Sequence, residues 1–195
     1  MTGIDAQKPL TPDEVRAIDA GMDRCAVLVL PGQDITDAQQ LAFTANFGAF
    51  QEGANSTERR PELRLHPAFA DVSNLDRTGQ KLARDDRRRM ASLGNRLWHS
   101  DASFRVVPAK YSILSGRIVV TAGGNTEFAD MRAAYDALDG ATKARIEGLN
   151  AYHSLHYSQG RVGHQTRKAD GEYSGYGLHD GPVPLRPLTE ATVRG

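Results

Sequence analysis

The stretch "LWHSDASF", residues 97 to 104, holds side chains that could do chemistry. His99 and Asp101 stand two positions apart. On a β-strand, side chains at i and i+2 leave the same face, so the imidazole and the carboxylate would converge on one point. Two histidines and one carboxylate form the facial triad of non-heme Fe(II) oxygenases. The pair therefore suggests part of a metal site. The alternative is an ordinary strand-edge histidine bonded to a nearby acid.

The composition limits the classes of protein to consider. The chain has 195 residues with 24 basic and 24 acidic side chains, so we expect one domain. A balanced charge argues against a nucleic-acid binder or an anionic-membrane binder, both of which need a basic excess. Cys25 is the single cysteine, which fits a reducing, cytoplasmic location. Neither a signal peptide nor an apolar run of membrane-spanning length is evident in the sequence.

Two helices are predicted near the N-terminus because each has a capping box. In "LTPDEVRAIDAGMDR" Thr11 can cap the helix with Glu14 three positions later, and in "ITDAQQLAFTANFG" Thr36 can do so with Gln39. Two further helices, "MRAAYDAL" and "ATKARIEGL", are expected on either side of a break at Gly140.

Strands are predicted from apolar runs and alternation. Besides the strand that would hold His99 and Asp101, the expected strands are "CAVLVL" (25–30), "ADVSNL" (70–75), "KYSILSGRIVV" (110–120) and "TEFAD" (126–130). The charged stretch 79–92 has little apolar periodicity and is interpreted as a mobile loop. Strands with inserted helices predict an α+β or β-sandwich fold.

The sequence around the opening motif resembles a known family. "NRLWHSDASF", followed by "AKYSILSGRIVVTAGGNTEFADMRAAYDAL", is similar to the taurine/2,4-dichlorophenoxyacetate dioxygenases, and within that family to the aryloxyalkanoate branch. "VLVLPGQDITDAQQLAFTANFGAF" resembles the family's N-terminal segment. The resemblance implies an α+β fold with a double-stranded β-helix core (jelly-roll, cupin-like) and flanking helices. It also implies Fe(II) as cofactor, with 2-oxoglutarate and O2 as co-substrates.

The same resemblance implies roles for four residues. His99 and Asp101 match the first two iron ligands. Thr126 matches the threonine that bonds the distal carboxylate of 2-oxoglutarate, although alone it reads as an ordinary strand residue. Asn95 lies where relatives place a residue that touches the substrate, and a turn asparagine is its alternative. The implied reaction is hydroxylation of a small organic acid next to an ether oxygen, which releases succinate and CO2.

The resemblance also has a gap. The family's second histidine ligand and the arginine that binds the 2-oxoglutarate tail have no counterpart here, since no histidine follows His179. We therefore expect residues 1–195 to be a single, truncated dioxygenase domain, incomplete at its C-terminal end. Three functions stay open: an aryloxyalkanoate dioxygenase in aromatic compound catabolism, a taurine or alkylsulfonate dioxygenase, and a catalytically inactive remnant. The oligomeric state, including a homo-oligomer, also stays open.

Other polar clusters have plainer interpretations. His153 and His156 could pair on a metal if they lay on a helix, but a core or pocket-lining position is favoured. "RDDRRR", residues 84–89, could bind a phosphate or nucleic acid, although its self-compensating charge favours a solvated loop. "AGG" before Asn125 predicts a tight turn, because the glycine pattern and helix of a phosphate-binding loop are absent.

Overall fold

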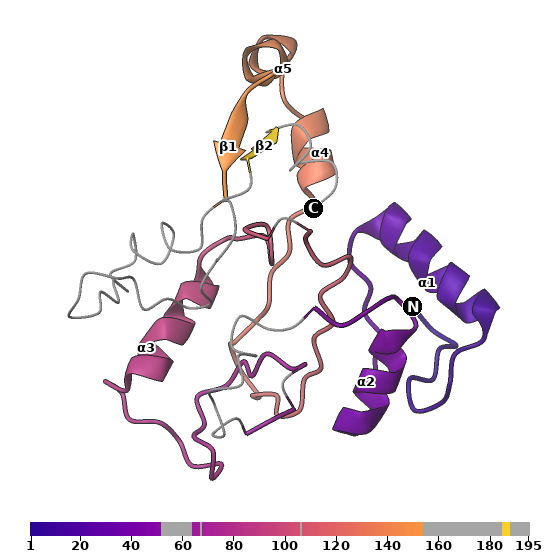
Figure 1. Cartoon of the computed structure of the whole chain (residues 1–195), viewed down its shortest axis with the longest axis vertical. Helices are drawn as coiled ribbons and strands as arrows, with labels where there is room; N and C mark the ends of the chain where they lie inside the picture. Colours follow the sequence, from indigo (N-terminus) through magenta and orange to yellow (C-terminus); the bar gives the residue numbers. More distant parts are fainter. Residues whose placement is uncertain (52–63, 67, 106, 154–184, 188–195) are drawn as a thin grey trace. The chain divides into compact units, whose positions relative to one another are not determined.

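The computed structural model describes most of the chain, in two compact units. Residues 52–63, 67, 106, 154–184 and 188–195 lie outside the described part. The first unit comprises Met1–Phe50 and Lys110–Lys143, and the second unit comprises Gln51–Ala109 and Ala144–Gly195. Figure 1 labels the α-helices and the β-strands. The elements are α1 (Pro12–Cys25), α2 (Asp37–Ala45), α3 (Arg87–Ser92), the 3-10 helix η1 (Leu93–Arg96), α4 (Met131–Asp136), α5 (Gly140–Ile146), β1 (Asn150–Tyr152) and β2 (Leu185–Pro187).

Both predicted capping boxes are confirmed. The Thr11 hydroxyl accepts a hydrogen bond from the Glu14 amide, and the Glu14 carboxylate accepts one from the Thr11 amide at 2.7 Å. Thr36 and Gln39 make the same reciprocal pair at the start of α2. Each box satisfies backbone N–H groups that have no partner within the first turn of a helix.

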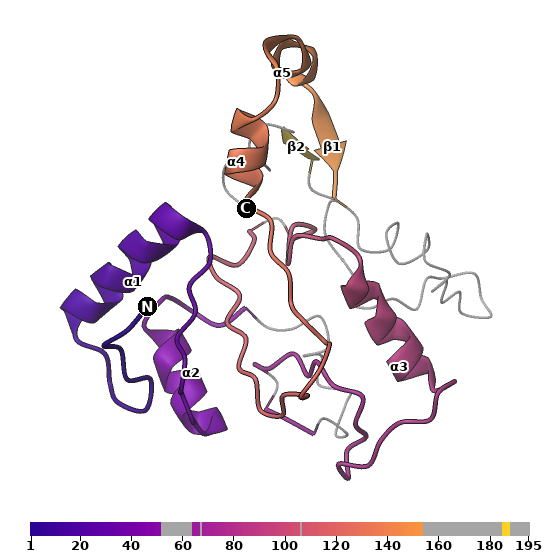
Figure 2. The ribbon, with the colours of Figure 1, turned by 180° about the vertical axis from the view of Figure 1, so that it is seen from behind.

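Helices α1 and α2 bring their apolar residues into one small core. Ile18 of α1 and Phe43 of α2 are buried together with Ala6 and Ile35. The Phe43 ring lies 5.5 Å from the Phe47 ring, centroid to centroid. The two helices therefore lie side by side, as Figure 2 shows from behind.

Residues 110 and 111 are tied to α1 by polar side chains. The Asp19 carboxylate accepts hydrogen bonds from the Tyr111 hydroxyl at 2.6 Å and from the Lys110 ammonium at 2.9 Å. These two bonds hold the pKa of Asp19 below its usual value. The Tyr111 ring also makes an edge contact with Phe47.

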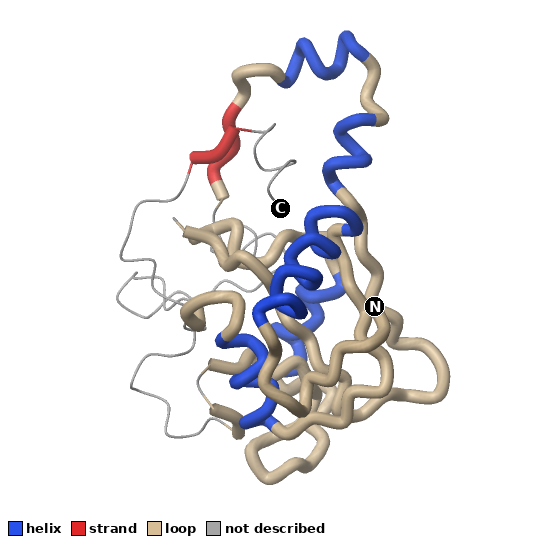
Figure 3. Tube along the Cα trace, turned by 90° about the vertical axis from the view of Figure 1, so that its right-hand side faces the viewer, coloured by secondary structure: helices blue, strands red, loops and turns tan. Residues whose placement is uncertain are grey.

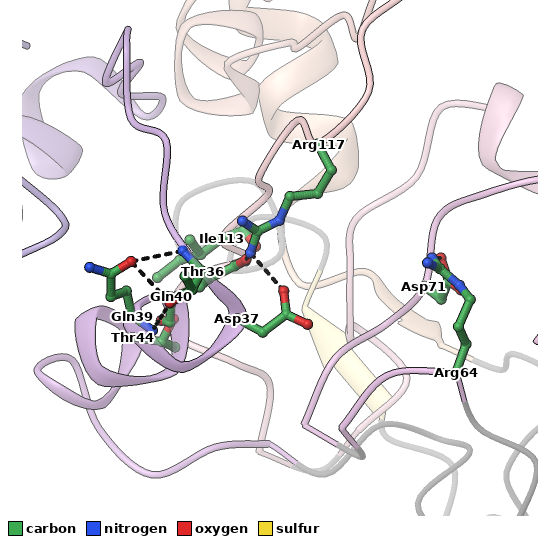
Figure 4. Close-up of polar contacts among 9 residues, drawn as sticks. All are labelled: Thr36, Asp37, Gln39, Gln40, Thr44, Arg64, Asp71, Ile113 and Arg117. Atoms are coloured by element: carbon green, nitrogen blue, oxygen red, sulfur yellow. Dashed lines mark hydrogen bonds and ion pairs between the residues drawn. The ribbon is translucent and has the colours of Figure 1, made fainter. Parts of the chain in front are cut away.

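Residues 113 and 117 are tied to α2 in a similar way (Figure 4). The Arg117 guanidinium donates to the Asp37 carboxylate and to the Gln40 side-chain oxygen, each at 2.9 Å. Gln40 is buried, and its amide nitrogen donates to the Ile113 carbonyl at 3.5 Å. Because these residues are 73 to 80 positions apart in the sequence, no local pattern could have predicted the contacts.

Among the described residues of the second unit, local turns and the ion pair of Arg64 with Asp71 hold the chain together. The Asp76 carboxylate accepts hydrogen bonds from the amides of Thr78 and Gln80, which closes a tight turn. The Arg64 guanidinium forms a two-point contact with the Asp71 carboxylate at 2.8 and 2.9 Å. Strands β1 and β2 pair antiparallel, with Ala151 opposite Arg186.

The strand predictions are wrong for the described residues. Figure 3 draws 27–30, 97–104, 110–120 and 126–130 as loop. Residues 70–75 supply only one isolated bridge, Leu75 to Lys81. Cys25 belongs to α1 instead, because the helix continues until Ala26, whose φ of 61° ends it. A strand needs a hydrogen-bonded neighbour, and the predicted neighbours do not pair with one another here.

The prediction of a mobile loop at 79–92 is also wrong in part, because α3 occupies Arg87–Ser92. The Met90 amide donates to the Asp86 carbonyl, as the first turn of a helix requires. Arginine, methionine and alanine are good helix formers, so intrinsic propensity outweighs the missing apolar periodicity here. Among the helices that the structure describes, none is long and apolar enough to cross a membrane.

Candidate metal centre

The candidate metal ligands lie in a loop rather than on a strand, with Asp101 at the start of a turn and His99 just before it. Residues 101–104 form turns, and Ala102 has a φ of 56°. The Arg105 amide closes this bend by donating to the Ala102 carbonyl at 2.9 Å. The predicted element is therefore wrong. The turn nevertheless brings the two predicted side chains together, with His99 Nε2 at 3.2 Å from Asp101 Oδ1.

The backbone fixes which nitrogen of His99 faces the carboxylate. His99 Nδ1 lies 2.7 Å from the Leu97 carbonyl oxygen. A carbonyl only accepts, so Nδ1 carries a proton and donates. A neutral ring would then direct the Nε2 lone pair at the carboxylate oxygen. Two such atoms 3.2 Å apart need a positive species between them. A proton would give an imidazolium–carboxylate pair, and a metal ion would be bound by both groups. A backbone acceptor on Nδ1 is the usual way to orient a ligating histidine.

The spacing of the two donors fits a cation. Imidazole and carboxylate ligands stand about 2.1 Å from zinc, so two such ligands at a right angle would be about 3.0 Å apart. The observed 3.2 Å is close to this value. Both side chains are exposed, which leaves the outward side accessible. Within the described ranges no group of three His, Cys, Asp or Glu side chains is gathered as a metal site would require. The pair could thus offer two ligands to a metal ion.

The structure places Asn95 and Thr126 without testing their predicted roles. Asn95 is exposed in η1, in the same unit as His99. Thr126 is exposed in the other unit, between the Gly123–Gly124 bend and α4. Gly123 and Gly124 have φ values of 73° and 70°, as a sharp bend there requires. The predicted pairing of His153 with His156 involves residue 156, which lies outside the described residues.

Comparison with known proteins identifies the family. The model of the taurine catabolism dioxygenase TauD, TfdA family matches residues 2–179. The chain therefore belongs to this dioxygenase family.

Individual relatives carry more specific names. The (S)-phenoxypropionate/alpha-ketoglutarate-dioxygenase of Sphingobium herbicidovorans is 48% identical over 167 residues, which are 85% of this chain and 53% of the relative. The alpha-ketoglutarate-dependent 2,4-dichlorophenoxyacetate dioxygenase of Cupriavidus pinatubonensis is 43% identical over 150 residues, which are 77% of this chain and 52% of the relative.

A solved structure is similar as well. The crystal structure of AAD-2 in complex with Mn(II) and N-oxalylglycine matches with a TM-score of 0.76 and 53% identity, and covers 87% of this chain and 57% of that one. The chain thus shares the fold of that protein over the matched part. It spans about half the length of the curated relatives it matches.

Proposed function

We propose that this chain belongs to an Fe(II)- and 2-oxoglutarate-dependent dioxygenase that hydroxylates a small aryloxyalkanoate. The observation that carries the proposal is the contact between His99 Nε2 and Asp101 Oδ1, in a chain that is 48% identical to a phenoxypropionate dioxygenase. We also propose that the matched residues belong to a double-stranded β-helix core. The alternation of partly buried and exposed residues from 111 to 116 supports this assignment, because such alternation is typical of a strand.

The proposed roles follow from the chemistry of each side chain. His99 Nε2 and Asp101 would hold Fe(II), while the Leu97 carbonyl fixes the imidazole ring. The Thr126 hydroxyl would donate to the distal carboxylate of 2-oxoglutarate, and the Asn95 amide would contact the organic substrate. When bound, the iron supplies the oxygen activation that couples C–H hydroxylation to conversion of 2-oxoglutarate into succinate and CO2.

The two ligands also predict how firmly the metal is held. A facial triad uses three protein ligands, and His99 and Asp101 provide two of them. We therefore expect the loss of either side chain to weaken metal binding.

The substrate class has one alternative. The alkylsulfatase of Acinetobacter baylyi is 29% identical over 161 residues of this chain. This relative favours a sulfur oxyanion as a second candidate in place of the carboxylate. The two candidates share the metal pair and the proposed role of Thr126, so they differ only in the groups that contact the substrate.

The chain contains its own reporter for metal binding. Trp98 is the single tryptophan and precedes His99 directly. We expect anaerobic titration with Mn(II) to quench Trp98 fluorescence with saturation. His99→Ala should weaken the apparent affinity at least tenfold. His66→Ala is the matched control, because His66 is an exposed histidine of the same unit and should leave binding unchanged. Equal quenching in all three proteins would contradict the metal site.

Turnover is a separate measurement. Succinate release from 2-oxoglutarate would be followed with Fe(II) and O2 over a panel of aryloxyalkanoates and alkylsulfonates. Release dependent on an aryloxyalkanoate supports the proposal, and release dependent only on a sulfonate supports the second candidate. Saturable metal binding without succinate from any substrate would show that this chain alone is inactive.

A further inference from the structure

Ala102 follows the candidate metal ligand Asp101 directly and has an uncommon backbone conformation. Its φ is 56°, in the left-handed region. Among the described residues other than glycine, Ala26 and Ala102 have such a value. In this region the Cβ atom of an L-residue lies too close to the following carbonyl oxygen, so the conformation is strained and persists only where the surroundings hold it.

The strained conformation has a structural reason at Ala26 that is missing at Ala102. Ala26 ends helix α1, and its amide donates to the Met22 carbonyl at 2.8 Å, as a left-handed residue commonly does at a helix C-terminus. Ala102 lies in a turn and ends no helix. Backbone strain that serves no helix end is often found where a functional group must be positioned.

The chain after Ala102 is fixed by two hydrogen bonds. The Arg105 amide donates to the Ala102 carbonyl at 2.9 Å. The Gln51 side-chain amide donates to the Val107 carbonyl, also at 2.9 Å. Because the turn after Ala102 is held in this way, the φ of Ala102 sets the direction in which the preceding peptide, and with it Asp101, leaves the turn.

The chain before Ala102 is held less firmly. His99 contacts the Leu97 carbonyl through Nδ1 and the Asp101 carboxylate through Nε2. The side chains of His99 and Asp101 are 48% and 60% exposed, so packing contributes little to their placement. Their contact therefore depends on the backbone directions of this short segment, and the strained residue directly after Asp101 is one of the positions that set them.

We infer that Ala102 is a positioning residue. Its left-handed backbone directs the Asp101 carboxylate toward His99 Nε2, so that both atoms can hold one cation. The inference rests on the proposed function, because it concerns the same two ligands. It also makes a clear distinction between substitutions. Glycine adopts a positive φ at no steric cost, whereas β-branched valine is a genuine outlier there.

The first test needs no metal. In the wild type we expect a nuclear Overhauser effect between the imidazole protons of His99 and the β protons of Asp101. Ala102→Val should weaken this effect at least threefold, and Ala102→Gly should preserve it. Ala102→Gly should also leave the melting temperature unchanged or raise it, because relief of strain offsets the greater freedom of glycine in the unfolded chain. This second measurement tests the inference even if Ala102→Val fails to fold.

The second test is Mn(II) affinity, measured by quenching of Trp98 fluorescence. Ala102→Val should weaken the apparent affinity at least tenfold, and Ala102→Gly should weaken it less than threefold. The matched control is Ala26→Val, which introduces the same side chain at a similar φ of 61° in the first unit. Both valine variants should lower the melting temperature, but Ala26→Val should leave the affinity for Mn(II) unchanged.

Several results would overturn the inference. Ala102→Val could keep both the ring contact and the affinity, or Ala26→Val could weaken the affinity as much. Equal losses in Ala102→Gly and Ala102→Val would show that the methyl group matters and the value of φ does not, and a lower melting temperature for Ala102→Gly would remove the strain. The proposed function can fail separately: a ring contact that depends on residue 102 in a chain that binds no Mn(II) would contradict the metal site alone.

Discussion

Asp71 forms an ion pair with Arg64 in the second unit, and protonation of the Asp71 carboxylate affects the stability of the fold. Burial alone would raise the pKa of Asp71, but hydrogen bonds from Arg64 and Ser73 outweigh it and hold that pKa below its ordinary 3.8. The carboxylate stays charged in the folded chain at a pH where it would be protonated in the unfolded chain. The pair therefore stabilises the fold above the unfolded pKa, and the contribution is lost as the pH falls through the folded pKa.

We predict that Asp71→Asn lowers the free energy of unfolding by about 1 kcal/mol at pH 7, since the ion pair with Arg64 is bidentate and its side chains are only about a third exposed. The difference from the wild type should shrink below about pH 4. Urea unfolding followed by circular dichroism at several pH values measures it. Asp13→Asn is the control, because the Asp13–Arg16 pair is highly exposed and should change stability little at any pH. A pH-independent loss for Asp71→Asn would refute the electrostatic origin.

At the scale of elements, local hydrogen bonds of the capping box set the start of helix α1. The side chains of Thr11 and Glu14 satisfy backbone N–H groups of the first turn without any help from the rest of the chain. We predict that Thr11→Ala costs about 1 kcal/mol of stability. Thr2→Ala, at an exposed position near the terminus, should cost nearly nothing. Thermal unfolding by circular dichroism compares the two variants. Equal losses would show that the capping box does not stabilise α1.

This difference between local and distant causes explains what the sequence could predict. The helices α1 and α2 were predictable because their caps involve residues three positions apart. The strands were not, because a run such as 110–120 becomes a strand only when a partner strand supplies hydrogen bonds. The residues themselves specify strand-like alternation, and the structure keeps it from 111 to 116 without the pairing.

The candidate site also combines a feature that the sequence predicts with one that it could not predict. The His99–Asp101 contact was predicted from two-residue spacing on a strand, and it forms in a loop at the start of a turn instead. A turn bends the chain sharply enough to bring side chains two positions apart together, so proximity does not identify the element. The hydrogen bond from His99 to the Leu97 carbonyl could not be predicted, because it depends on the backbone conformation of that turn.

At the scale of the whole molecule, the described chain has a small core. Among the described residues, the buried hydrophobic side chains are Ala6, Ile18, Ile35, Phe43 and Leu82. Large apolar residues of the segment 114–128 are exposed. Burial of apolar area is the main favourable term in folding, so we expect stability near or below the lower end of the usual range, about 5 kcal/mol. Exposed apolar surface should also bind the dye ANS at neutral pH.

Phe43 belongs to the core, whereas Phe128 belongs to the exposed apolar surface. Phe43 is buried against Phe47 and Ile18, so we predict that Phe43→Ala costs about 3 kcal/mol and leaves a large fraction of the chain unfolded. Phe128 is 62% exposed, so Phe128→Ala should change the free energy of unfolding by less than about 0.5 kcal/mol. It should instead reduce ANS fluorescence, because part of the exposed surface is removed. Urea unfolding and ANS titration of both variants test this. A similar loss of stability in both would mean that residues 114–128 are already packed in solution.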